Sequence, residues 1–200
     1  AAHPPAGPSS PSPQVPDNMK RSHSLWCSAL LLGALAALAP AQIKSFTLEE
    51  MVTTADSAVY GQIVASRVFR VDHPLDGDEL YFTELTIQGR SLKDGTPTTV
   101  AVPYNGGFVS ESEGVFNSEA PAKDDVKVGN KIVAFYVWTD DMGGDVAANA
   151  LVAAHGGLYR TVDGPRGAAI LGRGEGYALR SNVRMSELES SLEHLYKAKR

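Results

Sequence analysis

The sequence predicts a mainly β domain, folded as a small and partly open β-barrel with a short N-terminal helix and an amphipathic C-terminal helix. Two observations support this prediction. Short runs of β-branched and aromatic residues, separated by glycine-containing turns, recur through residues 58–171. The runs are uneven in length and several contain interior glycines, which favours a small barrel over a parallel sheet.

The first expected element is a helix that follows Thr47. Residues 47–50 read Thr-Leu-Glu-Glu, a capping box in which Thr47 is the N-cap and Glu50 reaches back to its amide. Apolar residues then recur at helical spacing, namely Leu48, Met51 and Val52.

Four main strands are expected, at residues 58–71, 80–91, 98–102 and 132–138. Gly61 interrupts the first strand and predicts a bend or bulge there. The second strand alternates, with one face formed by Tyr81, Thr83, Leu85 and Ile87. The fourth is the most hydrophobic run and is expected at the centre of the sheet.

The remaining elements are shorter. Residues 140–145 are expected to form a hairpin tip. Three short strands should follow, at residues 150–153, 158–162 and 168–171. A second capping box, Ser-Glu-Leu-Glu at 186–189, predicts a C-terminal helix with Ser186 as its N-cap. Its apolar stripe comprises Leu188, Leu192, Leu195 and Tyr196.

A secretory signal peptide is expected at residues 19–41. Met19-Lys20-Arg21 precedes a mostly apolar run at 25–39, and Ala39-Pro40-Ala41 offers the small residues that a signal peptidase reads. Residues 1–18 are Pro-rich and are expected to be a disordered extension outside the native protein. The alternative is an uncleaved membrane anchor, although the apolar run falls short of the roughly 20 residues that a spanning helix needs.

Cleavage after residue 41 would leave a single 159-residue domain, 42–200. It would remove two basic residues and one acidic residue, shifting the formal net charge from −5 to −6. This charge, without a basic run, disfavours nucleic-acid binding. Cleavage would also remove Cys27, the only cysteine, and with it disulfides and thiolate catalysis. No cofactor is expected.

Several segments resemble a group of uncharacterised exported bacterial proteins. The matching segments are "ADSAVYGQIVAS" (55–66), "YFTELTIQGRSLKDG" (81–95), "TTVAVPYNGG" (98–107), "VKVGNKIVAFYVW" (126–138) and "AAHGGLYRTVDG" (153–164). The resemblance implies a netrin-module-like barrel of the oligonucleotide/oligosaccharide-binding (OB) type, the architecture of the tissue inhibitors of metalloproteases. Those inhibitors present an N-terminal cysteine to the protease zinc, whereas the expected mature terminus here is Gln42-Ile43-Lys44. Inhibition by that mechanism is therefore not supported.

Residues 103–127 are expected to form a long loop, the best candidate for a contact surface. Its apolar residues either pack under the loop or present anchors to a partner: Phe108, Val109, Val115 and Phe116.

A metal site is a second hypothesis, because imidazole and carboxylates lie close together in the sequence at His73, Asp76 and Asp78. The competing interpretation is a polar hairpin tip. The acidic turn around Asp140, Asp141 and Asp145 has the same two interpretations. His155, beside Gly156-Gly157, is a candidate acid/base group or a structural histidine.

The sequence therefore predicts an exported binding or interaction module with an unknown ligand. Its expected partner is another exported protein or a cell-envelope component. Two alternatives stay open: a secreted hydrolase or metal-dependent enzyme that uses His73 or His155 with nearby acids, and a membrane-tethered structural protein of the envelope.

Overall fold

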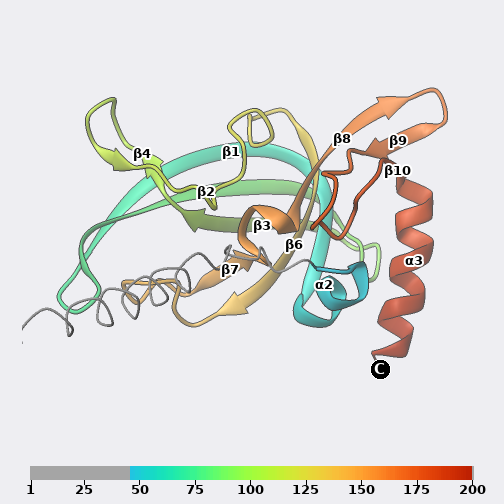
Figure 1. Ribbon diagram of the computed structural model, residues 1–200, viewed down its shortest axis with the longest axis horizontal. Helices are drawn as coiled ribbons and strands as arrows, with labels where there is room; N and C mark the ends of the chain where they lie inside the picture. The colour runs from blue at the N-terminus through green and yellow to red at the C-terminus, as the bar shows by residue number, and fades with distance from the viewer. Residues whose placement is uncertain (1–45, 200) are drawn as a thin grey trace, which may run out of the picture. The chain divides into compact units, whose positions relative to one another are not determined.

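The computed structural model describes residues 46–199 and has a mainly β fold with a helix at each end (Figure 1). The expected signal peptide and the Pro-rich extension lie outside the described residues. The elements are α2 (Leu48–Thr54), β1 (Ser57–His73), β2 (Gly77–Ser91), β3 (Pro97–Asn105), β4 (Gly107–Phe108), β5 (Gly114–Val115), β6 (Lys131–Thr139), β7 (Ala148–Leu151), the 3-10 turn η2 (Ala154–Gly157), β8 (Leu158–Gly164), β9 (Gly167–Ile170), β10 (Val183–Arg184) and α3 (Met185–Ala198).

One antiparallel sheet contains most of the strands, in the order β10-β9-β8-β6-β1-β2-β3, and β7 also pairs with β6. Strand β6 therefore lies inside the sheet, between β1 and β8, as its hydrophobicity predicts. A separate two-stranded sheet, β4-β5, projects from the end of β3 and appears at the upper left of Figure 1.

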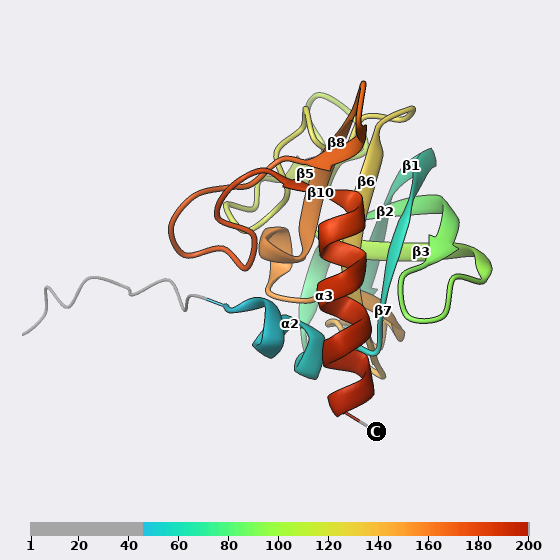
Figure 2. The ribbon, with the colours of Figure 1, turned by 90° about the vertical axis from the view of Figure 1, so that its right-hand side faces the viewer.

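The sheet has an apolar core on each face. Strand β6 contributes alternately to both: Ile132 and Ala134 join one cluster, while Val133 and Phe135 join the other. The second of these clusters is covered by the two helices, which lie side by side in Figure 2. No helix within residues 46–199 combines the length and the apolar character needed to cross a membrane.

The sheet is not closed into a barrel by hydrogen bonds, since no ladder joins β3 to β7 in the described part of the chain. The geometry of β3 gives a reason. Gly106 N–H donates to the Tyr81 carbonyl (2.7 Å), whereas the Asn105 carbonyl accepts from Asn117 Nδ2 (2.9 Å) on the opposite side. The backbone N–H and C=O groups of successive residues in an antiparallel strand point to opposite edges. Pro103 therefore faces the same free edge of β3 as Asn105, and it has no N–H to donate there.

Several local expectations are confirmed. Glu50 N–H donates to Thr47 Oγ1 (3.1 Å) and Thr47 N–H donates to Glu50 Oε2 (2.8 Å), which completes the first capping box. The expected hairpin tip at 140–145 joins the antiparallel pair β6-β7.

Other boundaries differ from the prediction. Helix α3 starts at Met185 with Arg184 as its N-cap, so the assignment of Ser186 as the cap is wrong. Glu187 accepts from Arg184 N (3.2 Å), and Met185 is drawn into the helix because its side chain is buried in the core. Residues 103–127 are not one loop, since they contain the end of β3 and the β4-β5 sheet. The sequence pattern missed β4 and β5 because a two-residue strand is too short to show alternation of apolar and polar residues.

Gly61 marks a close approach between strands. The shifts of register in the β1-β2 ladder fall elsewhere, between Ile63 and Ala65 and between Val71 and His73. Gly61 lies opposite Gly89 in the β1-β2 ladder. A Cβ added at Gly89 would lie 2.1 Å from the Tyr60 carbonyl oxygen, and one added at Gly61 would lie 2.4 Å from the Gln88 oxygen. The strands can run this close only because both positions lack a side chain.

The Gly89→Ala variant should therefore lose about 3 kcal/mol of unfolding free energy, because the clash is with backbone that cannot rotate away. Urea unfolding followed by circular dichroism measures this loss. Gly164→Ala is the control, since its added Cβ would be 3.5 Å from its nearest neighbour. Equal stability of the two variants would contradict the close-approach argument.

Lys199, just beyond α3, caps the other helix. Its Nζ donates to the carbonyl oxygens of Val52 (3.3 Å), Thr53 (2.9 Å) and Ala55 (3.1 Å). These carbonyls lie at the C-terminal end of α2, where a cation is favourable. Lys199 therefore links the C-terminal ends of α2 and α3.

Replacing Lys199 with Met should lower the unfolding free energy by about 0.5–1 kcal/mol, since the carbonyls lose their cation. Thermal unfolding at low ionic strength is the measurement. Lys197→Met is the matched control because Lys197 pairs with Glu193 on its own helix (2.7 Å) and not, within residues 46–199, with α2. A loss no greater than that of the control would show that the contact to α2 contributes nothing.

Candidate binding groove

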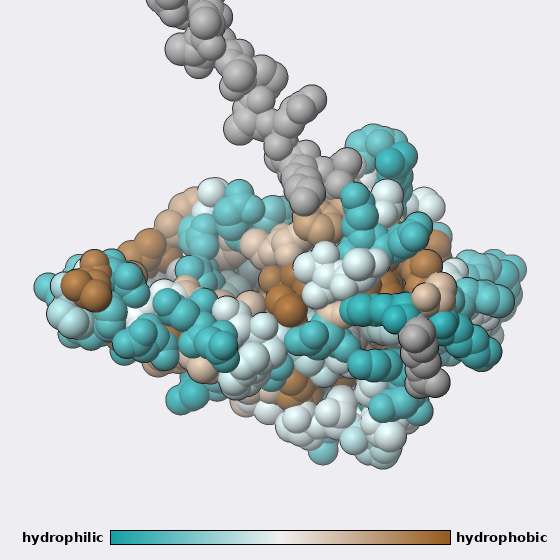
Figure 3. Space-filling model, turned by 90° about the horizontal axis from the view of Figure 1, so that it is seen from below, coloured by the Kyte–Doolittle hydropathy of each residue, from teal (hydrophilic) through white to brown (hydrophobic). Residues whose placement is uncertain are grey.

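The four residues predicted to contact a partner gather on the β4-β5 hairpin. Phe108 lies on β4, where it pairs with Gly114, and Val115 lies on β5 opposite Gly107. Phe108, Val109 and Val115 are about half exposed (45%, 50% and 46%), and Phe116 is 78% exposed. On the face of the molecule seen in Figure 3, apolar patches are interrupted by polar groups. An exposed apolar group of this kind is typical of an interaction site.

A groove of about 450 Å³ lies beneath this hairpin. Three of the predicted residues line it, Phe108, Val115 and Phe116, whereas Val109 lies outside the lining. The other walls come from distant parts of the chain and include Val68, Thr83, Tyr104, Pro121 and Lys123. The groove is thus built by β1, β2, β3 and the segment that follows β5.

Hydrogen bonds hold the hairpin in place over the groove. Buried Thr83 donates from Oγ1 to the Gly106 carbonyl at 2.6 Å. Gly107 packs so closely that an added Cβ would lie 2.3 Å from Thr83 Oγ1. Val109 N–H donates to the Glu113 carbonyl (2.8 Å), which closes the hairpin turn. The apolar side chains therefore project from a fixed backbone.

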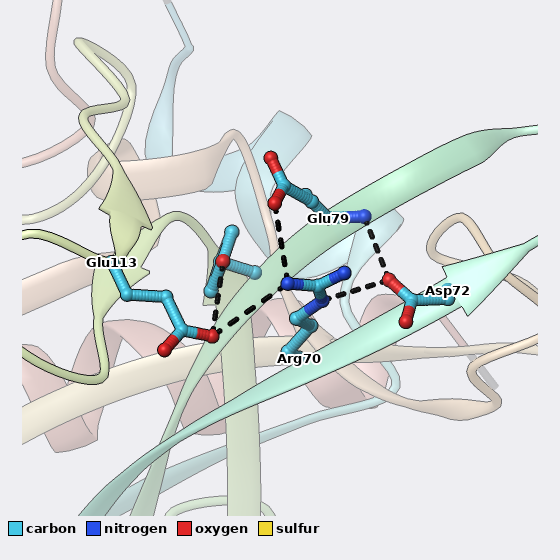
Figure 4. Close-up of polar contacts among 5 residues, drawn as sticks. Arg70, Asp72, Glu79 and Glu113 are labelled. Atoms are coloured by element: carbon cyan, nitrogen blue, oxygen red, sulfur yellow. Dashed lines mark hydrogen bonds and ion pairs between the residues drawn. The ribbon is translucent and has the colours of Figure 1, made fainter.

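An ion-pair network contacts the hairpin at its turn (Figure 4). Arg70 of β1 contacts Asp72 (Nε to Oδ1, 2.8 Å), Glu79 (Nη1 to Oε1, 3.2 Å) and Glu113 (Nη1 to Oε1, 3.7 Å). Tyr81 O–H also donates to Glu113 Oε1 at 3.4 Å. Because Glu113 belongs to the β4-β5 turn, one guanidinium connects that turn to β1 and β2.

The network shifts the ionisation of its members. The hydrogen bond from Arg70, followed by the Glu79 N–H (2.9 Å), lowers the pKa of Asp72 below its ordinary value of 3.8. The same ion pair raises the pKa of Arg70. In the groove, burial raises the pKa of Tyr104, so its phenol stays neutral at physiological pH.

A second hollow, of about 470 Å³, adjoins the groove and shares Tyr104 and Asn117 as walls. It lies between β3 and β7, which no ladder joins in the described part of the chain. We call this boundary the seam and the hollow at it the seam hollow. Its lining includes Pro103, Glu119, Asp141, Met142 and Leu151. No sequence pattern predicts this hollow, because its walls come together only through the tertiary fold.

His73 is held by groups from two turns. Its Nε2 lies 3.2 Å from Asp145 Oδ2, and its Nδ1 accepts from Asp76 N–H at 3.1 Å. Asp76 in turn accepts from Gly144 N–H (2.7 Å), so the β1-β2 turn is fastened to the β6-β7 loop. Within the described residues Asp78 joins none of these contacts, and no group of three or more His, Cys, Asp or Glu could hold a metal ion. The metal hypothesis therefore has no geometric support.

His155 lies in the η2 turn with both ring nitrogens engaged. Nδ1 is 3.1 Å from the Glu119 carbonyl oxygen and Nε2 is 3.0 Å from Tyr177 Oη. Since a carbonyl can only accept, Nδ1 carries a proton and donates it to this oxygen. Arg173 stacks on the Tyr177 ring, with its Cζ 4.6 Å from the ring centre. None of these partners contacts His73, so the two histidines do not form one site.

Comparisons with protein-family models, with curated protein sequences and with solved structures found no match to this chain. The groove and the seam hollow therefore have to be interpreted from their own chemistry.

The Arg70 network predicts a specific titration. In Arg70→Gln the pKa of Asp72 should rise toward 3.8, because the main group that stabilises its carboxylate is lost. Carboxyl-carbon NMR measures this value. A lowered folded-state pKa adds stability above the unfolded pKa, and this stability is lost as the pH falls through the folded one. The pH dependence of unfolding below pH 4 should therefore be weaker in the variant.

Arg67→Gln is the control for this titration, since Arg67 lies on the same strand but pairs with Glu84 (2.7 Å). In Arg67→Gln the pKa of Asp72 should stay below 3.8, as in the wild type. An equal rise of the Asp72 pKa in both variants would mean that general positive charge, and not the Arg70 contact, is responsible.

Proposed function

We propose that this protein is an exported binding module that holds a protein partner in the groove under the β4-β5 hairpin. The observation that carries the proposal is the set of four large apolar side chains on one hairpin, fixed in place and exposed to solvent. Burying apolar surface stabilises a complex by about 25 cal/mol per Å². Partly exposed aromatic residues over a preformed groove are the usual anchors of an interface.

The finer description of the fold belongs to the same proposal: a partly open barrel of the OB type, with the netrin-module likeness that the sequence suggests. It is supported by the core cluster that contains Ile132 and Ala134, which we call the inner core. Six strands contribute side chains to that one cluster, including Val59 of β1, Leu85 of β2, Val102 of β3, Ile132 of β6, Leu151 of β7 and Leu158 of β8. Such a cluster is the interior that a small barrel encloses.

Export and the nature of the partner follow from the sequence. The leader at residues 19–41 directs the domain out of the cytoplasm, and the mature domain carries a net negative charge. The partner is another exported protein or an envelope component, and not a nucleic acid. A hydrolase using His73 or His155 has less support, because each ring is already held by its own set of neighbours.

The test is selection from a random twelve-residue peptide library displayed on phage. The wild-type domain should enrich peptides with apolar residues, and Phe116→Ser should lose at least about tenfold in affinity for them, since a buried aromatic anchor contributes about 2 kcal/mol or more. Binding of the synthesised peptides is measured by fluorescence anisotropy.

Leu75→Ser is the matched control, because Leu75 is 88% exposed but lies on the β1-β2 turn, away from the groove lining. It should bind the selected peptides like wild type. If no peptide is enriched, or if Phe116→Ser and Leu75→Ser bind equally well, the groove is not the binding surface.

A further inference from the structure

The groove and the seam hollow form two compartments on either side of Tyr104 and Asn117, which wall both. The groove measures about 450 Å³ and the seam hollow about 470 Å³, and their shared walls make them neighbours. A ligand long enough to reach across Tyr104 would contact both.

The two compartments differ in charge. Among the residues that the structure describes, Lys123 is the only charged side chain lining the groove, where its Nζ lies 5.9 Å from the Phe108 ring centre. The seam hollow has the opposite character: Glu119 and Asp141 line it, and no Lys or Arg of the described chain does. Both carboxylates belong to exposed residues.

The carboxylates of these two acids make few contacts. Asp141 Oδ1 accepts from Gly143 N–H at 2.6 Å, a neutral donor. Glu119 Oε2 lies 3.8 Å from His155 Nδ1, farther than the 3.1 Å that separates this nitrogen from the Glu119 carbonyl oxygen. Within residues 46–199 neither carboxylate has a Lys or Arg partner. A cationic group entering the seam hollow would meet two carboxylates at its wall.

The backbone at the seam argues against a strand-addition mode of binding. Pro103 lacks an N–H at the free edge of β3, and the neighbouring Asn105 carbonyl is already occupied by Asn117. A peptide lying there must be recognised by its side chains.

We infer that the partner segment is an extended peptide that combines apolar residues, for the groove, with a basic side chain, for the seam hollow. The inference rests on the proposed function and deepens it by naming the chemistry of the ligand. Arginine suits the seam hollow best, because its planar guanidinium pairs bidentately with a carboxylate and stacks on aromatic rings, of which Tyr104 is one in the lining.

The experiment uses three fluorescein-labelled synthetic peptides that share one apolar block, Phe-Leu-Val, joined to Arg-Arg, Gln-Gln or Glu-Glu. Each is made in both block orders, because the direction of the bound chain is open. Fluorescence anisotropy with the wild-type domain should rank them Arg above Gln above Glu. The Arg peptide should bind about tenfold more tightly than the Gln peptide at low salt and lose this advantage at high salt.

The double variant Glu119→Gln, Asp141→Asn tests the seam hollow alone. The Asn keeps the acceptor for Gly143, so the loop is retained, and circular dichroism verifies the fold. This variant should bind the Arg and Gln peptides equally, with its affinity for the Gln peptide unchanged. The control is Asp78→Asn, Glu193→Gln, which removes the same charge from surfaces that line neither hollow.

The outcomes separate the two proposals. Equal binding of all three peptides that is lost in Phe116→Ser would overturn the basic-peptide inference and leave the groove intact as a binding site. A preference for the Glu peptide would also overturn it and would assign specificity to Lys123. If none of the peptides binds in either order, both the inference and the proposed function are rejected.

Discussion

Burial of β6 on both of its faces is the constraint on which the rest of this structure depends. Ile132 and Ala134 enter the inner core, while Val133 and Phe135 enter the core under the helices. All four are fully buried. Because side chains alternate along a strand, one nine-residue segment joins two cores, and the strands paired with it must curve around the inner one. The paired glycines Gly61 and Gly89 permit that curvature by letting β1 and β2 run close together.

The seam hollow exists because the sheet curves without closing between β3 and β7. The sheet bends β3 toward β7, yet Pro103 removes a donor at the edge where a ladder would form. Pro103, Tyr104 and Leu151 instead line a hollow at this seam. The chain then reverses at Gly106 and Gly107, whose φ angles of 97° and 141° suit glycine, and enters the β4-β5 hairpin. The same proline that leaves the edge open thus places a cavity beside the apolar groove, and it also protects the edge from uncontrolled pairing.

Sequence patterns predicted what depends on neighbours along the chain. Alternation in β2 and the apolar run of β6 located both strands, and Thr47 with Glu50 located the start of α2. The four apolar residues of the hairpin could be named as a contact surface because they stand out in a polar stretch. Contacts between distant residues had no such signal: Arg70 meets Glu113, and His73 meets Asp145, only after the sheet has formed. The N-cap of α3 was misplaced because tertiary burial of Met185 outweighed the local capping pattern.

The β4-β5 hairpin is attached to the sheet at two points, while its apolar side chains stay exposed. Apolar side chains on a free loop would fold back onto the protein, since exposing them costs free energy. Here Thr83 holds the start of the hairpin and Arg70 holds its turn, through Glu113. With the hairpin held at these two points, Phe116 remains 78% exposed. Under the proposed function, a partner that covers Phe116 would bury this apolar surface without first having to order the hairpin.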